Sequence, residues 1–239
     1  MRISNNNWLL NKPIAHRGLW NRNIPENSVL AYKNAIDNGY PIEIDLYLTT
    51  DNVLVCFHDE TLTRMTGVNK KIYDCSFDEI KELHLNGSQY LIPTFDEVLS
   101  LCENKTPLLI EIKNQPNSLV VDKTVERLKK YQGEFAVQSF NPLYIKKVKK
   151  LAPNFIRGIL GTQERENLSL LKHVIVKKML LNFLIKPDFI SYNKTAYPLK
   201  KRKTRKKTLL AWTVLSQEEM NECKKHVDNF IFENFIPNE

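Results

Sequence analysis

Residues 42–58 read Ile-Glu-Ile-Asp-Leu-Tyr-Leu-Thr-Thr-Asp-Asn-Val-Leu-Val-Cys-Phe-His, and this stretch combines a strand pattern with a chemical one. Two apolar runs flank a central Asp-Asn pair, which predicts a β-hairpin. In the ideal register, which is centred on Asp51, Asp45 is paired with Phe57. The hairpin therefore returns His58 to the acidic side chains of the first apolar run.

Outside the hairpin, apolar runs rich in Val, Ile, Leu and Phe alternate with segments of helical spacing. This alternation predicts a parallel sheet, and eight strands are what a closed (β/α)8 barrel needs. The predicted strands are Pro13–His16, Ile42–Leu46, Leu108–Ile112, Ala136–Phe140, Arg157–Leu160, Phe189–Tyr192, Leu209–Val214 and Asn229–Phe232. The predicted helices are Glu26–Asn38, Phe95–Glu103, Leu119–Tyr131, Leu143–Leu151, Leu168–Leu184 and Gln217–His226. Residues 59–91 show weak periodicity, which indicates an insertion after the second strand.

The length and composition favour one globular domain that spans residues 1–239. The chain has 239 residues, of which 42% are hydrophobic, and this is the usual size of a single α/β barrel. Neither a signal peptide nor an 18-residue uncharged run is present, so no transmembrane segment is expected and the cytoplasm is the predicted location. The four cysteines are widely scattered, which favours reduced thiols.

The net charge of +8 is concentrated in residues 200–207, where seven of eight residues are Lys or Arg. We interpret this basic run as a solvated loop, with contact to an anion, nucleic acid or membrane surface as the alternative. Apolar residues between Val174 and Leu184 also have amphipathic spacing with lysines among them. A barrel helix with a solvated face explains that spacing, and docking at a membrane surface is the alternative.

Polar side chains gather where the predicted strands end, the position at which barrel enzymes carry their reacting groups. Glu43 and Asp45 are two residues apart, so both carboxylates point to the same face of one strand. Glu111 and Lys113 share this spacing on the next strand. A divalent cation would relieve the repulsion between three converging carboxylates. The alternative is an ion pair between Glu111 and Lys113 with nothing bound.

Several motifs, in order along nearly the whole chain, resemble those of glycerophosphodiester phosphodiesterases. They are Ala15-His16-Arg17-Gly18, Pro25-Glu26-Asn27-Ser28, Glu43-Ile44-Asp45-Leu46, Thr50-Asp51, Phe57-His58-Asp59, Leu62-Thr63-Arg64, Thr66-Gly67, Ile92-Pro93-Thr94-Phe95, Ile110-Glu111-Ile112-Lys113, Gln138-Ser139-Phe140 and Ala211-Trp212-Thr213-Val214. The resemblance implies a TIM-type (β/α)8 barrel with a small insertion after the second strand.

The resemblance also implies a role for each site residue. His16 and His58 match the catalytic pair, and Arg17 and Lys113 match positions that bind the phosphate. The implied ligands of a divalent metal ion, which would be magnesium, calcium or manganese, are Glu43, Asp45 and Glu111. The implied reaction is metal-dependent hydrolysis of a glycerophosphodiester to glycerol phosphate and an alcohol, with acid-base catalysis by the two histidines.

The sequence departs from the family pattern near the end of the chain. Leu215 stands where the family commonly has Asn, and Glu233-Asn234 replaces its usual Thr-Asp or Thr-Asn. These changes leave the substrate open, and the alternative is a related barrel phosphodiesterase acting on a lipid, sugar or cell-surface polymer phosphodiester. A non-enzymatic alternative is a phosphate-binding module that recruits nucleic acid or membrane. Because binding alone needs no acid-base pair, we expect a small-molecule phosphodiester as the ligand and no nucleic acid.

Overall fold

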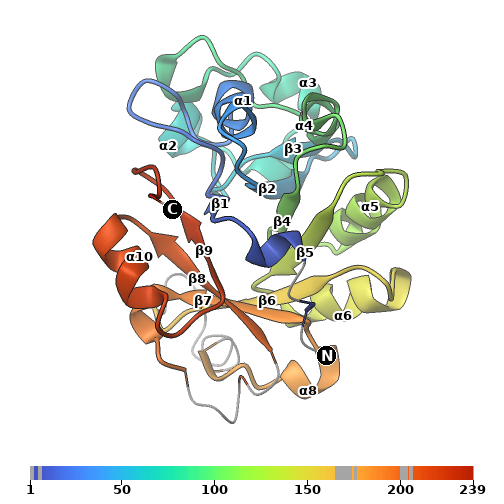
Figure 1. Ribbon diagram of the computed structural model, residues 1–239. Coiled ribbons are helices and arrows are strands. Elements are labelled where there is room, and N and C mark those ends of the chain that lie inside the picture. Colours follow the sequence, from blue (N-terminus) through green and yellow to red (C-terminus); the bar gives the residue numbers. More distant parts are fainter. Residues whose placement is uncertain are drawn as a thin grey trace. The chain divides into compact units, whose positions relative to one another are not determined.

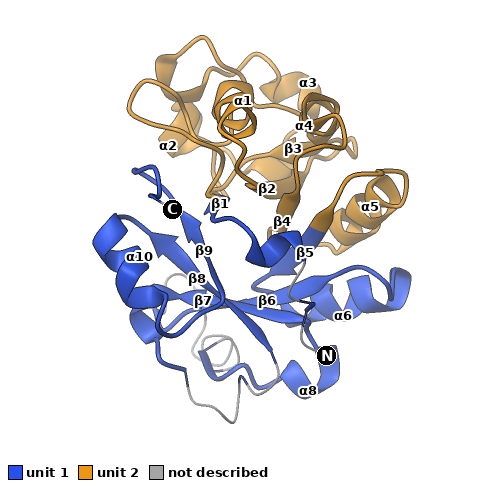
Figure 2. Ribbon diagram, viewed as in Figure 1, with its two compact units in different colours: residues 1–14, 136–239 blue, residues 15–135 orange. Residues whose placement is uncertain are grey.

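The computed structural model describes residues 3–4, 7–164, 174, 177–199, 204 and 207–238. The chain forms two compact units, which we describe separately (Figure 2). Unit 2 comprises residues 15–135, and unit 1 comprises residues 1–14 and 136–239. The boundaries fall inside strand β1 (Ile14–Ala15) and at the start of strand β5 (Phe135–Ser139).

The sheet of unit 2 is built around strand β2 (Ile42–Leu48), which is buried along its whole length. Strand β4 (Leu108–Ile112) pairs with it in parallel, and Asp45 lies opposite Glu111. Strand β3 (Leu54–Cys56) pairs with β2 in the antiparallel direction. The Phe57 amide donates to the Asp45 carbonyl at 3.1 Å, so the hairpin has the predicted register.

The helices of unit 2 are α1 (Val29–Asp37), α4 (Phe95–Cys102) and α5 (Leu119–Leu128). Helix α1 begins three residues later than the predicted start at Glu26. The Ser28 hydroxyl accepts from the Ala31 amide at 3.2 Å and caps the helix, and Asn27 has a left-handed backbone (φ +52°). Glu26 therefore lies in the preceding turn, where its side chain is available to the candidate site.

The predicted insertion contains two short helices, α2 (Thr63–Thr66) and α3 (Phe77–Ile80), and two 3₁₀ segments, Ile72–Asp74 and Leu85–Gly87. Its apolar side chains pack onto the hairpin in one hydrophobic cluster. The buried members are Tyr47, Val55, Phe57, Leu62, Met65, Ile72, Cys75, Ile80, Leu85 and Ile92. The insertion thus has its own core and holds its two helices firmly beside β2 and β3 (Figure 1).

Unit 1 contains a parallel sheet in which each strand pairs with the next one along the chain. Its strands are β5, β6 (Arg157–Gly161), β7 (Phe189–Asn193), β8 (Thr208–Val214) and β9 (Asn229–Phe232). Its helices include α6 (Pro142–Leu151), α8 (Asn182–Ile185) and α10 (Gln217–Cys223), and 3₁₀ segments lie at Trp8–Leu10 and Lys194–Ala196.

All eight predicted strands are present, with their ends within two residues of the predicted positions. The helices α5 and α10 end three residues before the predicted ends at Tyr131 and His226. Helix α8 overlaps the end of the predicted helix Leu168–Leu184, of which residues 168–173, 175 and 176 lie outside the described residues. The basic run 200–207 is also outside them, apart from Thr204 and Lys207.

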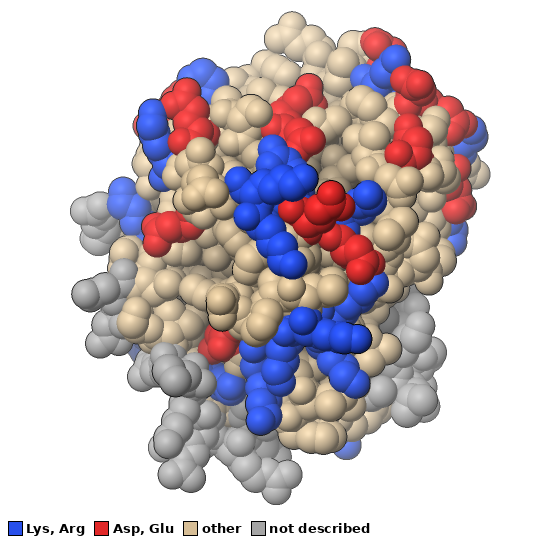
Figure 3. All heavy atoms as spheres, turned by 90° about the vertical axis from the view of Figure 1, so that its right-hand side faces the viewer, with Lys and Arg blue, Asp and Glu red and all other residues tan. Residues whose placement is uncertain are grey.

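Basic and acidic side chains lie next to one another in the upper part of the face shown in Figure 3, and basic side chains predominate lower down. Among the described residues, the model contains no helix that is both long and apolar enough to cross a membrane.

Candidate functional site

The three predicted metal ligands lie together on β2 and β4. The parallel register places Asp45 opposite Glu111, and Glu43 precedes Asp45 on the same face of β2. One carboxylate oxygen from each of the three residues lies within 4.8 Å of the others, and all three side chains are buried. The structure therefore forms the acidic cluster that the two-residue spacing along the strand predicts.

The carboxylates of this cluster do not all ionise with equal ease. Burial, together with repulsion from Asp45 and Glu111, raises the pKa of Glu43 well above its ordinary value. Burial also raises the pKa of Glu111. Burial acts in the same direction on Asp45, but the nearby Lys113 and the other cationic groups outweigh it and hold the pKa of Asp45 below its ordinary range.

Lys113 lies directly beside the acidic cluster. Its Nζ is 3.0 Å from Glu111 Oε1 and 3.3 Å from Asp45 Oδ1. Burial favours the neutral amine, but the two carboxylates outweigh this effect and raise the pKa of Lys113, so the ammonium stays charged. The ion pair considered as an alternative to a metal site is therefore present. It includes Asp45 as well as Glu111, and it leaves Glu43 without contact to Lys113.

Arg17 reaches the cluster from a tight turn after β1. Its amide donates to Glu43 Oε2 at 3.2 Å, and its Nε lies 3.4 Å from Asp45 Oδ2. Both Arg17 (φ +58°) and Gly18 (φ +84°) have left-handed backbones. A Cβ on residue 18 would lie 2.6 Å from the carbonyl carbon of Ala31, so only glycine fits where this turn meets α1.

The two predicted catalytic histidines occupy loops before and after β2 in sequence. His16 directly follows β1, and its carbonyl accepts from the indole nitrogen of Trp20 at 3.1 Å. His58 follows β3, and its Nδ1 lies 2.7 Å from Asp59 Oδ1. Both rings are close enough to Asp45 to lower its pKa. The structure thus brings all seven predicted site residues together within unit 2.

The two ring nitrogens of His58 differ because only Nδ1 contacts Asp59. When the Nδ1–H donates to the Asp59 carboxylate, Nε2 is left free to exchange a proton with a substrate. Burial of the ring, assisted by the nearby Lys113, lowers the pKa of His58. The neutral imidazole is therefore the dominant form near neutral pH.

Four residues that the sequence analysis named in motifs without giving them a role also contact the site. The Asn27 amide donates to Asp45 Oδ2 at 3.0 Å, and Glu26 Oε1 lies 2.9 Å from Arg17 Nη1. Asp59 contacts His58, and Arg64 contacts both Asp59 and Glu26. The contacts of Asn27 with Asp45 and of Arg64 with Glu26 join segments that are 18 and 38 residues apart, so spacing within one segment does not reveal them.

The acidic cluster has the properties of a divalent cation site. All of its donors are carboxylate oxygens, which magnesium and calcium prefer. Asp45 Oδ1 is buried and accepts no hydrogen bond, although Lys113 lies nearby. Three carboxylates against two cationic side chains, Arg17 and Lys113, leave a formal charge of −1. A bound divalent cation would change this to +1, so the residues present fit such an ion.

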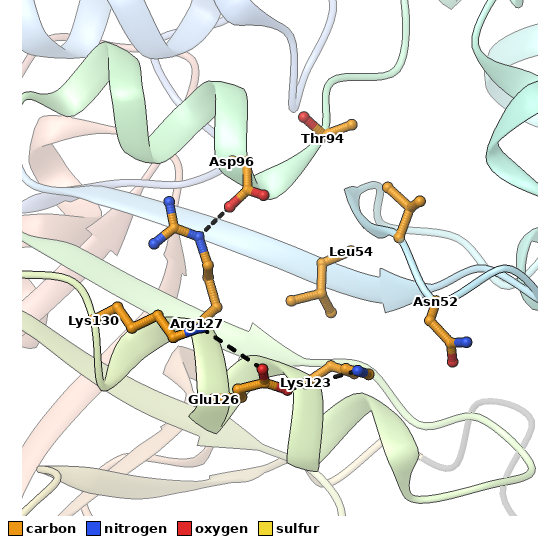
Figure 4. Close-up of a pocket in the computed structure, with 9 residues that line it drawn as sticks. Asn52, Leu54, Thr94, Asp96, Lys123, Glu126, Arg127 and Lys130 are labelled. Carbon is orange, nitrogen blue, oxygen red and sulfur yellow. Dashed lines mark hydrogen bonds and ion pairs between the residues drawn. The ribbon is translucent and has the colours of Figure 1, made fainter.

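One pocket in unit 2 has a volume of about 280 Å³ and contains none of the seven predicted site residues. It is lined by Asn52, Val53, Leu54, Thr94, Asp96, Lys123, Glu126, Arg127 and Lys130. Figure 4 shows the Arg127 guanidinium directed at Asp96, and Glu126 pairs with Lys123 and Lys130. The two carboxylates of this pocket are thus paired with its three basic side chains, and we assign the pocket no role.

Comparison with known proteins places these residues in a family context. The sequence model of the Glycerophosphoryl diester phosphodiesterase family matches residues 16–236. A glycerophosphodiester phosphodiesterase from Caldanaerobacter subterraneus is 37% identical over 161 residues, which are 62% of this chain and 65% of that protein. Human lysophospholipase D GDPD1 is 33% identical over 138 residues, which are 52% of this chain and 43% of that protein. The matched segment thus spans less than two thirds of either relative.

Solved structures resemble the chain over almost its full length. A phosphodiesterase from Oleispira antarctica, in complex with the product sn-glycerol-3-phosphate, is 22% identical with a TM-score of 0.79. That alignment covers 94% of this chain and 93% of the other. At this level of identity the likeness shows the fold alone. The fold is a closed eight-stranded barrel with helices between the strands, which confirms the predicted TIM-type barrel.

Proposed function

Because the chain belongs to the glycerophosphoryl diester phosphodiesterase family, we propose that it hydrolyses a glycerophosphodiester to glycerol phosphate and an alcohol. The acidic cluster carries the proposal. Its three buried carboxylates lie beside Arg17 and Lys113 and within the electrostatic reach of two histidines. This arrangement combines an anion site, a cation site and two proton carriers, which together are what phosphodiester hydrolysis requires.

We propose that Glu43, Asp45 and Glu111 hold a magnesium or calcium ion. When bound, this ion would supply Lewis-acid stabilisation of the negative charge on the phosphate oxygens. The carboxylates fix its position because each is buried, and Asp45 is also held by the Asn27 amide. The Asn27 carbonyl oxygen in turn accepts from the Tyr32 hydroxyl at 2.7 Å, so the amide has one fixed orientation.

Arg17 and Lys113 are proposed to bind the phosphate group. In the transition state, charge gathers on the equatorial oxygens, and guanidinium or ammonium groups fixed beforehand stabilise it more than mobile ones do. Arg17 is fixed by Glu26, Glu43 and Asp45, and Lys113 by Asp45 and Glu111. Arg17 can approach two oxygens through its planar fork, whereas Lys113 acts as a point charge.

His16 and His58 are proposed to move the protons of the reaction. The leaving alkoxide must receive a proton, and the attacking hydroxyl must lose one, so two imidazoles in complementary protonation states serve both steps. The lowered pKa of His58 favours its neutral form, which is suited to accept a proton at Nε2. His16 would then deliver a proton to the leaving group.

Two routes agree with these roles, and they differ in the attacking group. Either water attacks directly, or the neighbouring hydroxyl of the glycerol attacks first and water then opens the cyclic phosphate. Quenched reactions in which the cyclic phosphate is measured would separate them. An early rise and later fall of the cyclic species supports the second route, and its absence at every time supports the first.

The test of the function is release of glycerol phosphate from glycerophosphocholine, glycerophosphoethanolamine and glycerophosphoglycerol, with magnesium or with excess chelator. We expect turnover with magnesium, loss of turnover with chelator, and recovery after magnesium is restored. Full activity in excess chelator would disprove the metal dependence. A failure to cleave any of the three with magnesium, calcium or manganese would disprove the proposed substrate class.

A lipid phosphodiester is the second candidate substrate, because a relative that is 33% identical over 138 residues bears the name lysophospholipase D. Turnover of lysophosphatidylcholine and of glycerophosphocholine, both measured by release of choline, decides between the two substrates. A higher kcat/KM for the lysolipid would favour the lipid. A sugar or cell-surface polymer phosphodiester stays an alternative, which competition by such a diester against glycerophosphocholine tests. The location in the cytoplasm and the single domain over residues 1–239 stay predictions of the sequence.

A further inference from the structure

Two motifs from the sequence, Pro25-Glu26-Asn27-Ser28 and Leu62-Thr63-Arg64, meet through the side chain of Arg64. Its Nε donates to Asp59 Oδ2 at 2.6 Å, and its Nη2 donates to Asp59 Oδ1 at 3.0 Å. The other edge of the same guanidinium holds Glu26, with Nη2 to Oε1 at 2.6 Å and Nη1 to Oε2 at 3.2 Å. The Arg64 guanidinium therefore binds two carboxylates at once, each through two hydrogen bonds.

Each of these carboxylates also contacts a residue of the candidate site. Asp59 Oδ1, which accepts from Arg64, lies 2.7 Å from His58 Nδ1. Glu26 Oε1, which also accepts from Arg64, lies 2.9 Å from Arg17 Nη1. The contacts form a continuous chain that runs from the His58 ring through Asp59, Arg64 and Glu26 to Arg17, and acidic and basic side chains alternate from Asp59 onward.

We propose that Arg64 is a positioning residue for both His58 and Arg17. It orients the histidine through Asp59 and the arginine through Glu26. The inference rests on the proposed function. The contacts of Arg64 are with Asp59 and Glu26 and not with the acidic cluster, so it acts through these two carboxylates. Because a carboxylate held by two hydrogen bonds cannot rotate freely, its remaining oxygen contact has a fixed direction.

The insertion is built to hold Arg64 in this position. Leu62, which directly precedes helix α2, and Met65, which follows Arg64 on the helix, are buried in the core of the insertion. The helix ends at Gly67, whose left-handed backbone (φ +77°) lets its amide donate to the Thr63 carbonyl. The side chain of Arg64 is half exposed, whereas that of Glu26 is nearly buried. The anchored backbone, rather than burial of the guanidinium, therefore fixes its place.

A lysine cannot perform this task, because an ammonium group lacks the two planar edges with which a guanidinium holds two carboxylates. The informative variants are therefore Arg64→Met, which removes the charge, and Arg64→Lys, which keeps it. Lys70→Met is the matched control, because Lys70 lies in the same insertion but outside the site. Its Nζ is 3.2 Å from Glu79 Oε1.

The first measurement is turnover of glycerophosphocholine by the magnesium-loaded protein. We expect Arg64→Met to lower kcat through His58 and to raise KM through Arg17, with a combined loss in kcat/KM of about 10- to 100-fold, as for outer-shell partners of active-site groups. Arg64→Lys should recover only a small part of this loss. Lys70→Met should stay within about twofold of wild type, since exposed ion pairs contribute little.

The second measurement does not depend on enzymatic activity. The ¹⁵N shifts of the His58 ring, assigned by comparison with His58→Ala, report which nitrogen carries the proton. We expect the Nδ1–H form in wild type and in Lys70→Met, and a mixture of both tautomers in Arg64→Met and Arg64→Lys. If wild type has no phosphodiesterase activity, the proposed function fails while this measurement still tests the positioning.

The proposal is overturned if the ring of His58 keeps the Nδ1–H form in both Arg64 variants. It is equally overturned if Arg64→Lys, which keeps the charge, matches wild type in kcat and KM. A structural role of Arg64 alone would lower the melting temperature without moving either the tautomer or kcat. Should Arg64→Met not fold, Arg64→Lys and Asp59→Asn provide the same comparison, and the tautomer of His58 decides it in both.

Discussion

His16 and His58 come from different loops of unit 2, yet both lower the pKa of Asp45. We expect His16→Ala and His58→Ala each to lower kcat on a glycerophosphodiester by at least about 100-fold, because general acid-base catalysis contributes about that much or more. The double variant should lose only modestly more, as expected of residues that act as one unit. Initial rates measured with magnesium in excess test this expectation.

A nitrophenyl phosphodiester identifies which histidine is the acid, since nitrophenolate leaves without receiving a proton. The variant that lacks the general acid should be rescued on this substrate, and the other variant should stay slow. Magnesium affinity measured by calorimetry serves as the control and should persist in both. Single variants near the wild-type rate on a glycerol diester would contradict the assigned roles.

At Glu43 the proposed metal binding and the stability of the metal-free protein make opposite demands on the carboxyl group. Its pKa is raised by burial and by repulsion from Asp45 and Glu111, so the folded protein binds a proton there more readily than the unfolded chain. The resulting stabilisation is fully present below the unfolded pKa near 4.5 and is lost as pH rises through the raised folded value. Metal-free Glu43→Gln, whose amide does not titrate, should therefore gain stability relative to wild type as pH rises above 4.5.

Magnesium should reverse this order. The ion stabilises the wild type in proportion to the logarithm of its concentration above Kd, whereas Glu43→Gln loses a ligand and should gain much less. Chemical unfolding between pH 4.5 and 7, with chelator and with magnesium, measures both effects. Equal magnesium affinity in the two proteins would remove Glu43 from the metal ligands. A stability difference that does not change with pH would contradict the raised pKa.

At the scale of elements, the hairpin shows what the sequence predicts well. Its turn residues and its two apolar runs define the register, so the pairing of Asp45 with Phe57 follows without any distant contact. The strand positions follow for the same reason, since each is a local apolar run. The predicted start of α1 at Glu26 was wrong, because the N-cap that Ser28 provides and the left-handed backbone of Asn27 outweigh the helical spacing.

The contacts of the site beyond its seven predicted residues depend on the folded chain and could not be predicted. Arg64 lies 38 residues from Glu26 in sequence, and no local pattern pairs the two residues. The same is true of Asn27, whose amide reaches Asp45 across 18 residues. Local spacing therefore predicts which side chains share a face of a strand, whereas the second layer of hydrogen bonds requires the structure.

The hairpin turn can be tested by itself. Asn52 has a left-handed backbone (φ +67°), which asparagine tolerates better than other residues with a Cβ apart from aspartate. We expect Asn52→Ala to lower the free energy of unfolding by about 1 kcal/mol, and Asn52→Gly to be neutral or stabilising. Thr50→Ala, at the other side of the same tip, is the control. Equal stability of Asn52→Ala and Asn52→Gly in urea would show that the backbone conformation costs nothing.

At the scale of the whole molecule, the net charge of +8 raises the question whether the basic run 200–207 contributes to function. We predict that it contributes no catalytic group, because seven of its eight residues repel one another and none of the predicted site residues belongs to it. Replacing it with a Ser/Gly linker of equal length should leave kcat and KM on a small diester within about twofold of wild type. A hundredfold loss would place this run in contact with the substrate.

The four cysteines test whether the chain behaves as the single domain that its length predicts. All four are free and buried, with Cys56, Cys75 and Cys102 in unit 2 and Cys223 in unit 1. Burial raises the pKa of Cys102 to about 12, so its thiolate is scarce as well as inaccessible in the folded protein. The native chain should therefore react very slowly with a thiol reagent at pH 8.

Site-specific labelling across a guanidinium titration, measured by mass spectrometry of the digested protein, then reports the unfolding of each unit separately. If residues 1–239 unfold as one cooperative domain, Cys223 should become reactive at the same denaturant concentration as Cys56 and Cys102. Cys223→Ser provides the control that labelling itself does not drive unfolding. Two well-separated midpoints would contradict the single domain, because they would mean that the two compact units melt independently even though together they supply the eight strands of the barrel.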